Sequence, residues 1–122
     1  MQIDKAKESL QAAEYCYEHE LYNSTANRAY YAMFQAAIVA MEVNGVKAVG
    51  ARWSHARVQS TFAQKLIRQH KAYPRTLARM LYDSLIIRNE ADYENINISK
   101  RQANKVLRWA RNFVQQIERS VK

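Results

Sequence analysis

Residues 26–37 read Ala-Asn-Arg-Ala-Tyr-Tyr-Ala-Met-Phe-Gln-Ala-Ala, and this stretch decides the fold. Its apolar side chains recur every three or four positions, at Tyr30 and Phe34 and onward to Met41. That spacing is typical of a helix with one buried stripe. Met33 lies outside the stripe and widens the apolar surface. The pattern therefore predicts a long helix that is buried on more than one side.

Turn-forming residues are scarce in the rest of the chain. Two glycines and one proline occur in 122 residues, which disfavours a sheet protein with its many turns. With short connections, successive helices run antiparallel. We therefore expect an all-α fold, an up-and-down bundle of four to five helices in a single domain over residues 1–122. Helices are predicted over residues 2–20, from 23–25 to 44, from 54 onward, from 74 to 89 and from 99 to 121.

Several helix boundaries carry their own signals. Ser99 with Gln102 three residues later fits a capping box, and Ser54 is a further N-cap. Asn44-Gly45 suits a C-terminal stop. Residues 23–25, Asn-Ser-Thr, are each suitable to cap the second helix. The segment 92–97 is interpreted as a connection.

The formal net charge of +8 is unevenly distributed. Residues 51–88 hold eight Lys or Arg against one acidic residue, and residues 99–122 hold seven against one. Residues 1–22 carry a net negative charge. Such basic faces attract polyanions, either RNA or an acidic protein partner. The alternative is that they are ordinary solvated helix faces.

Other classes of chemistry find no support in the sequence. Cys16 is the single cysteine, which excludes an internal disulfide and a Cys-rich zinc site. No two histidines have metal-ligand spacing, and no Gly-rich phosphate loop occurs, so neither a metal nor a cofactor is expected. No signal peptide and no apolar run of about 20 residues is present, which favours a cytoplasmic protein with no membrane contact.

Residues 88–93, Arg-Asn-Glu-Ala-Asp-Tyr, place charges at the end of an otherwise apolar helix. If this helix packs against the one containing Arg28, we expect Arg28, Arg88 and Asp92 to meet in one cleft. Buried charges are tolerated only when they are paired, so the cluster is either a structural ion-pair network or a functional site. Arg88 and Asn89 together suit a phosphate, because guanidinium and amide groups both donate hydrogen bonds.

The residues quoted above resemble the HEPN family (higher eukaryotes and prokaryotes nucleotide-binding), in particular its small stand-alone prokaryotic members. The resemblance rests on residues 26–37, the Ser-His pair at 54–55, Phe62, Arg88 and the Ala-Asp-Tyr segment at 91–93. It implies a helical bundle, a homodimer, and pairing with a small nucleotidyltransferase, often as a toxin–antitoxin module. Many members are metal-independent RNases that use an Arg, a polar residue and a later His.

Arg88 and Asn89 match the first half of that RNase motif, but no histidine follows His70. Asp92 or Tyr93 stands where the histidine would be, and a phenol with a pKa of about 10 is a poor substitute near neutral pH. The leading hypothesis is therefore a binding module for a nucleotide, RNA or a protein partner. Its expected site residues are Arg28, Tyr30, Tyr31, Arg88, Asn89, Asp92 and Tyr93.

Two alternatives stay open. The first is a metal-independent endoribonuclease in which Arg88 stabilises the charge that develops on the phosphate and Asn89 positions it. The second is a purely structural interaction protein. The resemblance adds one chemical role, because a related group is modified by its nucleotidyltransferase on a tyrosine near this motif, and Tyr93 is the matching residue here.

Overall fold

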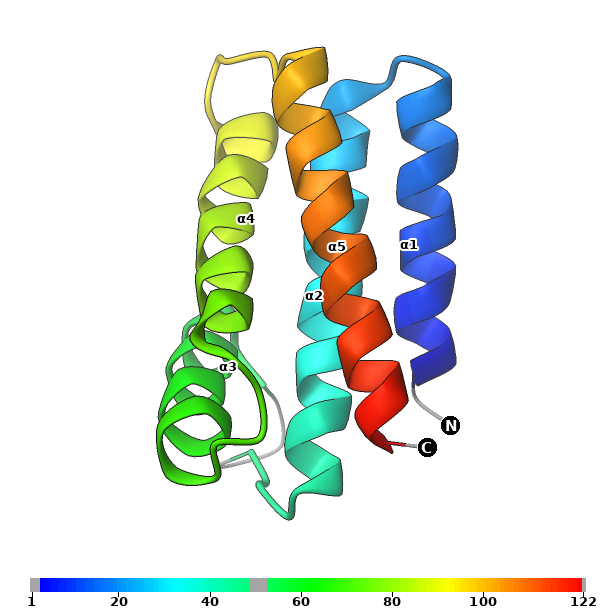
Figure 1. The fold of residues 1–122 in the computed structure, drawn as a ribbon. Helices are drawn as coiled ribbons and strands as arrows, with labels where there is room; N and C mark the ends of the chain where they lie inside the picture. Colours follow the sequence, from blue (N-terminus) through cyan, green and yellow to red (C-terminus); the bar gives the residue numbers. More distant parts are fainter. Residues whose placement is uncertain (1–2, 49–52, 122) are drawn as a thin grey trace.

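The computed structural model describes residues 3–48 and 53–121, and all of its regular structure is helical. No strand occurs within these ranges, so the predicted all-α helical bundle is confirmed. Figure 1 shows the helices running up and down beside one another. They are α1 (Ile3–Glu18), α2 (Tyr22–Val43), α3 (His55–Thr61), the π-helical η1 (Phe62–Gln69), α4 (Arg75–Tyr93) and α5 (Lys100–Val121).

Helix α2 lies at the centre of the bundle and contacts α1, α4 and α5 (Figure 1). This position follows from its composition, because small side chains allow neighbouring helices to approach from several sides. The prediction that this helix is buried on more than one side is confirmed. Its fully buried alanines are Ala26, Ala29, Ala32, Ala36, Ala37 and Ala40.

Aromatic rings link the short helical segment 55–69 to the main bundle. Phe62 is fully buried and lies 5.9 Å from the ring of Tyr73 and 5.4 Å from that of Phe113. Helix α3 and η1 follow each other without a break, with the chain changing from α to π winding at Phe62. These aromatic contacts thereby hold the first residues of α3, including His55, beside α2.

Most predicted boundaries are confirmed. The side chain of Ser54 accepts a hydrogen bond from the Arg57 backbone N–H, and Ser99 and Gln102 form the reciprocal bonds of a capping box. Gly45 follows α2 with a φ of +77°, a left-handed conformation that glycine adopts easily.

The predicted start of α2 is wrong. The helix begins at Tyr22, and its N-cap Leu21 makes no side-chain capping bond. Asn23 instead accepts a 2.8 Å hydrogen bond from the backbone N–H of Ile98, which ties the first turn of α2 to the α4–α5 connection. Leu21 is 51% exposed, because α1 has already ended at Glu18.

The end of α4 also differs from the prediction. The helix continues to Tyr93, so Asp92 and Tyr93 are helical and do not begin a connection. No helix-breaking residue intervenes, and Arg88 and Asp92 form an i,i+4 ion pair that supports the last turn. The difference matters for the site, because a helix holds these two side chains in a fixed direction relative to Arg88.

Candidate functional site

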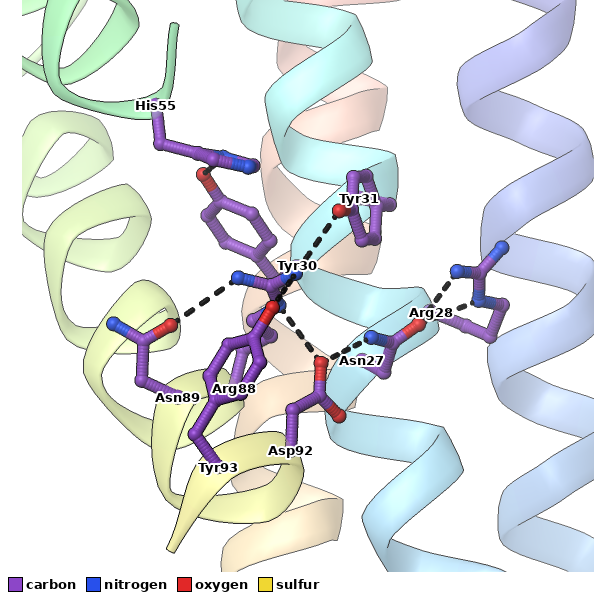
Figure 2. A network of polar contacts seen from close by, with 9 residues as sticks. All are labelled: Asn27, Arg28, Tyr30, Tyr31, His55, Arg88, Asn89, Asp92 and Tyr93. Atoms are coloured by element: carbon purple, nitrogen blue, oxygen red, sulfur yellow. Dashed lines mark hydrogen bonds and ion pairs between the residues drawn. The ribbon is translucent and has the colours of Figure 1, made fainter.

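Arg88 is a charged residue in the core of the bundle, with only 8% of its surface exposed. Figure 2 shows its guanidinium surrounded by polar and aromatic side chains from α2 and α4. Nη2 donates to the Tyr31 hydroxyl at 3.0 Å and to the Tyr93 hydroxyl at a long 3.5 Å. Nη1 donates to Oδ1 of Asn89 at 3.2 Å, and Nε lies 3.0 Å from Oδ2 of Asp92.

The contact with Asp92 compensates the buried charge mainly by Coulomb attraction. Although the two atoms are close, the angle is not that of a hydrogen bond, so the buried Nε of Arg88 has no hydrogen-bond partner among the described residues. The faces of three tyrosine rings add cation–π attraction. Their centroids lie 5.2 to 5.9 Å from the guanidinium carbon, for Tyr93, Tyr31 and Tyr30.

Asn27 joins the two polar segments that the sequence predicted to meet. Its amide nitrogen donates to Oδ2 of Asp92 at 2.7 Å, and its Oδ1 accepts from Nε of Arg28 at 2.8 Å. Arg28 itself lies over the Tyr31 ring at 5.1 Å and lines a hollow on the α1 side of α2, so it reaches the Arg88–Asp92 pair only through Asn27.

Sequence reasoning did not single out Asn27. A signal was nevertheless present, because residues 27, 30, 31 and 34 follow the i, i+3, i+4, i+7 spacing of one helix face. This spacing places Asn27 on the same helix face as Tyr30 and Tyr31, whereas Arg28 lies on a neighbouring face.

His55 is a second residue of the cluster that the sequence did not single out as a site residue. Its Nδ1 lies 2.7 Å from the hydroxyl of Tyr30, and its ring packs 4.9 Å from Phe34 and 6.0 Å from Tyr31. The RNase motif predicts a histidine after Arg88 in the chain, whereas the fold brings an imidazole to the cluster from the start of α3. Figure 2 shows His55 and Arg88 near opposite ends of the Tyr30 side chain.

The environment changes the acid–base properties of Tyr30 and His55. Burial raises the pKa of the Tyr30 hydroxyl well above its ordinary value, so it remains protonated. Burial, and secondarily the positive charge of Arg88, lower the pKa of His55, which keeps its imidazole neutral around neutral pH. A neutral imidazole can accept a proton, and here it is separated from the guanidinium by the Tyr30 side chain.

Tyr93 separates the guanidinium from solvent on the α4 side. The tyrosine is 73% exposed, while the Arg88 side chain beneath it is 9% exposed. Movement of one surface side chain would therefore open the cation to a ligand without disturbing the pair with Asp92. Tyr30, by contrast, is completely buried and supports the cluster from within.

Two further features bear on the kind of site. Within residues 3–48 and 53–121, no group of three or more His, Cys, Asp or Glu side chains lies close enough together to hold a metal ion. The same part of the chain has no helix with the length and apolar character needed to cross a bilayer.

The sequence matches the HEPN domain family over residues 2–120. The chain belongs to the HEPN domain family. Two relatives come from Methanocaldococcus jannaschii. "Putative toxin MJ0142" is 30% identical over 116 residues, covering 92% of this chain and 74% of that protein. "Putative toxin MJ0605" is 28% identical over 124 residues, covering 98% of this chain and 86% of that protein.

The pair between the buried Arg88 and the more exposed Asp92 predicts a measurable difference between two aspartates of α4. Asp92→Asn leaves the Arg88 charge uncompensated, and we expect the free energy of unfolding to fall by about 1–3 kcal/mol in urea titrations. Asp83→Asn is the matched control, because Asp83 also follows an arginine by four residues. Its pair with Arg79 is 4.0 Å long and mostly exposed, so the loss should stay below about 1 kcal/mol. Equal losses would contradict a stabilising role for the Arg88–Asp92 pair.

Proposed function

We propose that this HEPN protein is a toxin-like module whose Arg88 cluster binds a phosphate group and whose partner is a small nucleotidyltransferase. The observation that carries the proposal is the exposed hydroxyl of Tyr93, held 3.5 Å from a guanidinium that is otherwise buried. A phosphate attached to this hydroxyl, or replacing it, would meet a cation already oriented by Asp92 and Asn89. The relatives described as toxins support the module's general class.

The ligand contacts are proposed for the accessible part of the cluster. Arg88, Asn89, Tyr31 and Tyr93 surround the place where a nucleotide or an RNA phosphate would bind. Guanidinium and phosphate favour each other because of charge and because the guanidinium offers parallel N–H donors. Asp92 and the buried Tyr30 act as positioning residues.

Nucleotidylation of Tyr93 is the chemical step proposed for the partner. The phenolic oxygen attacks the α-phosphorus of a nucleoside triphosphate, the phenolic proton passes to a base of the transferase or to water, and pyrophosphate leaves. The new phosphodiester anion then lies beside Arg88. The exposure of Tyr93 makes it accessible to a second protein, and the nearby cation lowers the energy of the negatively charged product.

A matched pair of tyrosines on α4 tests this step. Incubation with a small nucleotidyltransferase and a nucleoside triphosphate should add one nucleoside monophosphate to the wild-type chain, measured by intact-protein mass spectrometry. Tyr93→Phe should abolish the mass increase. Tyr82→Phe should leave it unchanged, because Tyr82 is also exposed but has no cation–π contact with Arg88. Full modification of Tyr93→Phe would refute the assignment.

His55 favours RNA cleavage as a second candidate function. When Nδ1 donates its proton to the Tyr30 hydroxyl, Nε2 is free to accept one. Nε2 would take the proton of a ribose 2′-hydroxyl, whose oxygen attacks the adjacent phosphorus and displaces the 5′-oxygen of the next nucleotide. The products are a 2′,3′-cyclic phosphate and a 5′-hydroxyl that takes its proton from water, while Arg88 stabilises the additional charge on phosphorus.

This candidate predicts metal-independent cleavage that depends on His55 and on pH. With chelator present, cleavage of total RNA by wild-type protein should be lost in His55→Gln and retained in His70→Gln, which removes an exposed histidine at the end of η1. Because the pKa of His55 is lowered, the base form should persist at neutral pH, and the rate should decline only below its ordinary pKa of about 6.5. Equal cleavage by both variants would indicate a contaminating nuclease.

We also propose that two copies associate through the outer face of α4. Tyr82 and Ile86, one turn apart, are 57% and 43% exposed. Between α4 and the segment 55–69 lies a hollow of about 580 Å³, and its lining residues are Ala56, Gln59, Ser60, Ala63, Ala78, Arg79, Tyr82 and Leu85. Exposed apolar surface of this kind marks protein interfaces, and Tyr93 continues it toward the Arg88 cluster.

Light scattering after size exclusion tests this association. Wild-type protein should have twice the mass of the chain, and the double variant Tyr82→Glu/Ile86→Glu should have the mass of one chain, because burying charges against an apolar face is unfavourable. Val43→Glu introduces a charge at a similarly exposed apolar residue on α2 and should remain a dimer. A monomeric wild type would rule out this interface.

A further inference from the structure

A basic hollow lies on α5, on the face of the bundle away from the Arg88 cluster. Helix α5 stands in front of α2 in Figure 1, whereas in Figure 2 it lies behind α2 and the Arg88 cluster. The hollow has a volume of about 560 Å³. We call it the α5 basic groove, and its lining residues are Tyr17, Lys100, Arg101, Asn104, Lys105 and Arg108.

The charges of this groove are not neutralised within the described part of the chain. Lys100, Arg101, Lys105 and Arg108 are exposed, and none of them forms an ion pair with a described acidic side chain. Farther along α5 the situation is different, since Arg111 pairs with Glu14 at 2.6 Å. Four uncompensated cations therefore gather in the first half of the helix, where they generate a locally positive potential.

The spacing of these cations matches a chain of phosphates. With a rise of about 1.5 Å per residue, Arg101 and Arg108 lie roughly 10 Å apart along the helix axis, with Lys105 between them. Phosphates rise about 3.4 Å apart along the axis of a duplex strand and lie farther apart in an extended single strand, so roughly two to three phosphates of a single strand span this length. A single small anion would leave most of this row of charges unused.

One aromatic ring lines the groove, and a second contacts a lysine that lines it. Tyr17 from α1 lines it and accepts a 3.2 Å hydrogen bond from Asn104. The Lys105 ammonium lies 5.2 Å from the ring centre of the half-buried Trp109. Trp109 itself lines an adjoining hollow of about 230 Å³. If Lys105 turns toward a phosphate, it uncovers the indole face, on which a nucleobase can stack.

We infer that the α5 basic groove binds a single-stranded polynucleotide through its phosphodiester backbone, with Trp109 as a stacking platform. Cations in a row together with flanking aromatic rings are the combination that single-strand binding uses. An acidic protein segment would be attracted by the charges but has no need of the indole. The inference goes beyond the proposed function, because it concerns a different face and does not depend on Arg88 or Tyr93.

The test measures the affinity of a labelled single-stranded RNA oligonucleotide, and of the same sequence as DNA, by fluorescence anisotropy at several salt concentrations. Replacing two exposed cations, Arg101→Gln/Arg108→Gln, should weaken binding roughly tenfold at moderate salt. The slope of log K against log salt should fall by about 1.4, which is two contacts at about 0.7 each. Melting temperatures confirm that the variant is folded.

The matched control is Arg68→Gln/Arg75→Gln, which removes the same charge from exposed positions in η1 and α4. It should change the affinity less than twofold. Equal weakening by the two double variants would show that only net charge matters and would overturn the inference, as would a salt-independent affinity. Displacement of the strand by polyglutamate as effectively as by unlabelled RNA would reassign the groove to an acidic protein.

Fluorescence provides a readout that general electrostatic attraction would not change. The chain contains two tryptophans, so Trp53→Phe leaves Trp109 as the single tryptophan, whose emission is followed by excitation at a wavelength that tyrosine does not absorb. Addition of the oligonucleotide should quench this emission, because a stacked base contacts the indole, and Arg101→Gln/Arg108→Gln should shift the quenching to higher oligonucleotide concentration. Binding without quenching would refute the stacking role. Nucleotidylation of Tyr93 is a separate measurement, so failure of either proposal leaves the other intact.

Discussion

The buried guanidinium of Arg88 sets the requirement that organises the site. A charge with 8% exposure is tolerated only if its surroundings replace the water it has lost. Asp92 supplies the counter-charge from the same helix, Tyr31 supplies a hydrogen-bond acceptor from α2, and Asn27 connects Asp92 back to α2. These contacts fix how α4 lies against α2, and the same contacts determine in which direction Tyr93 projects.

The cluster has two different ends, and each end supports one of the two proposed functions. At the surface, Tyr93 offers an accessible hydroxyl beside the cation, which suits modification by a partner and phosphate binding. Toward α3, His55 offers a neutral imidazole, which suits proton transfer. The α5 basic groove is separate from both, so a polynucleotide held there would engage a face that the cluster leaves free.

Local sequence signals predicted those parts of the structure that depend on neighbours in the chain. The capping box at Ser99, the cap at Ser54 and the stop at Gly45 each require only a few adjacent residues, and each is confirmed. The predicted start of α2 is wrong because Asn23 forms a hydrogen bond with Ile98, a partner 75 residues away that no local pattern reveals. For the same reason local patterns single out the charged Arg28 and not Asn27, whose partner Asp92 is 65 residues away.

The amino-acid sequence by itself determined the all-α bundle and the burial of the alanine-rich helix on more than one side, because periodicity and composition report which surfaces must be buried. It also singled out the charged segment 88–93. Only the tertiary structure decided which polar groups meet. It brought His55 to Tyr30 across 25 residues and Asn27 to Asp92 across 65. The physical reason is that a hydrogen bond depends on distances of about 3 Å between atoms, and helix packing, not sequence separation, sets those distances.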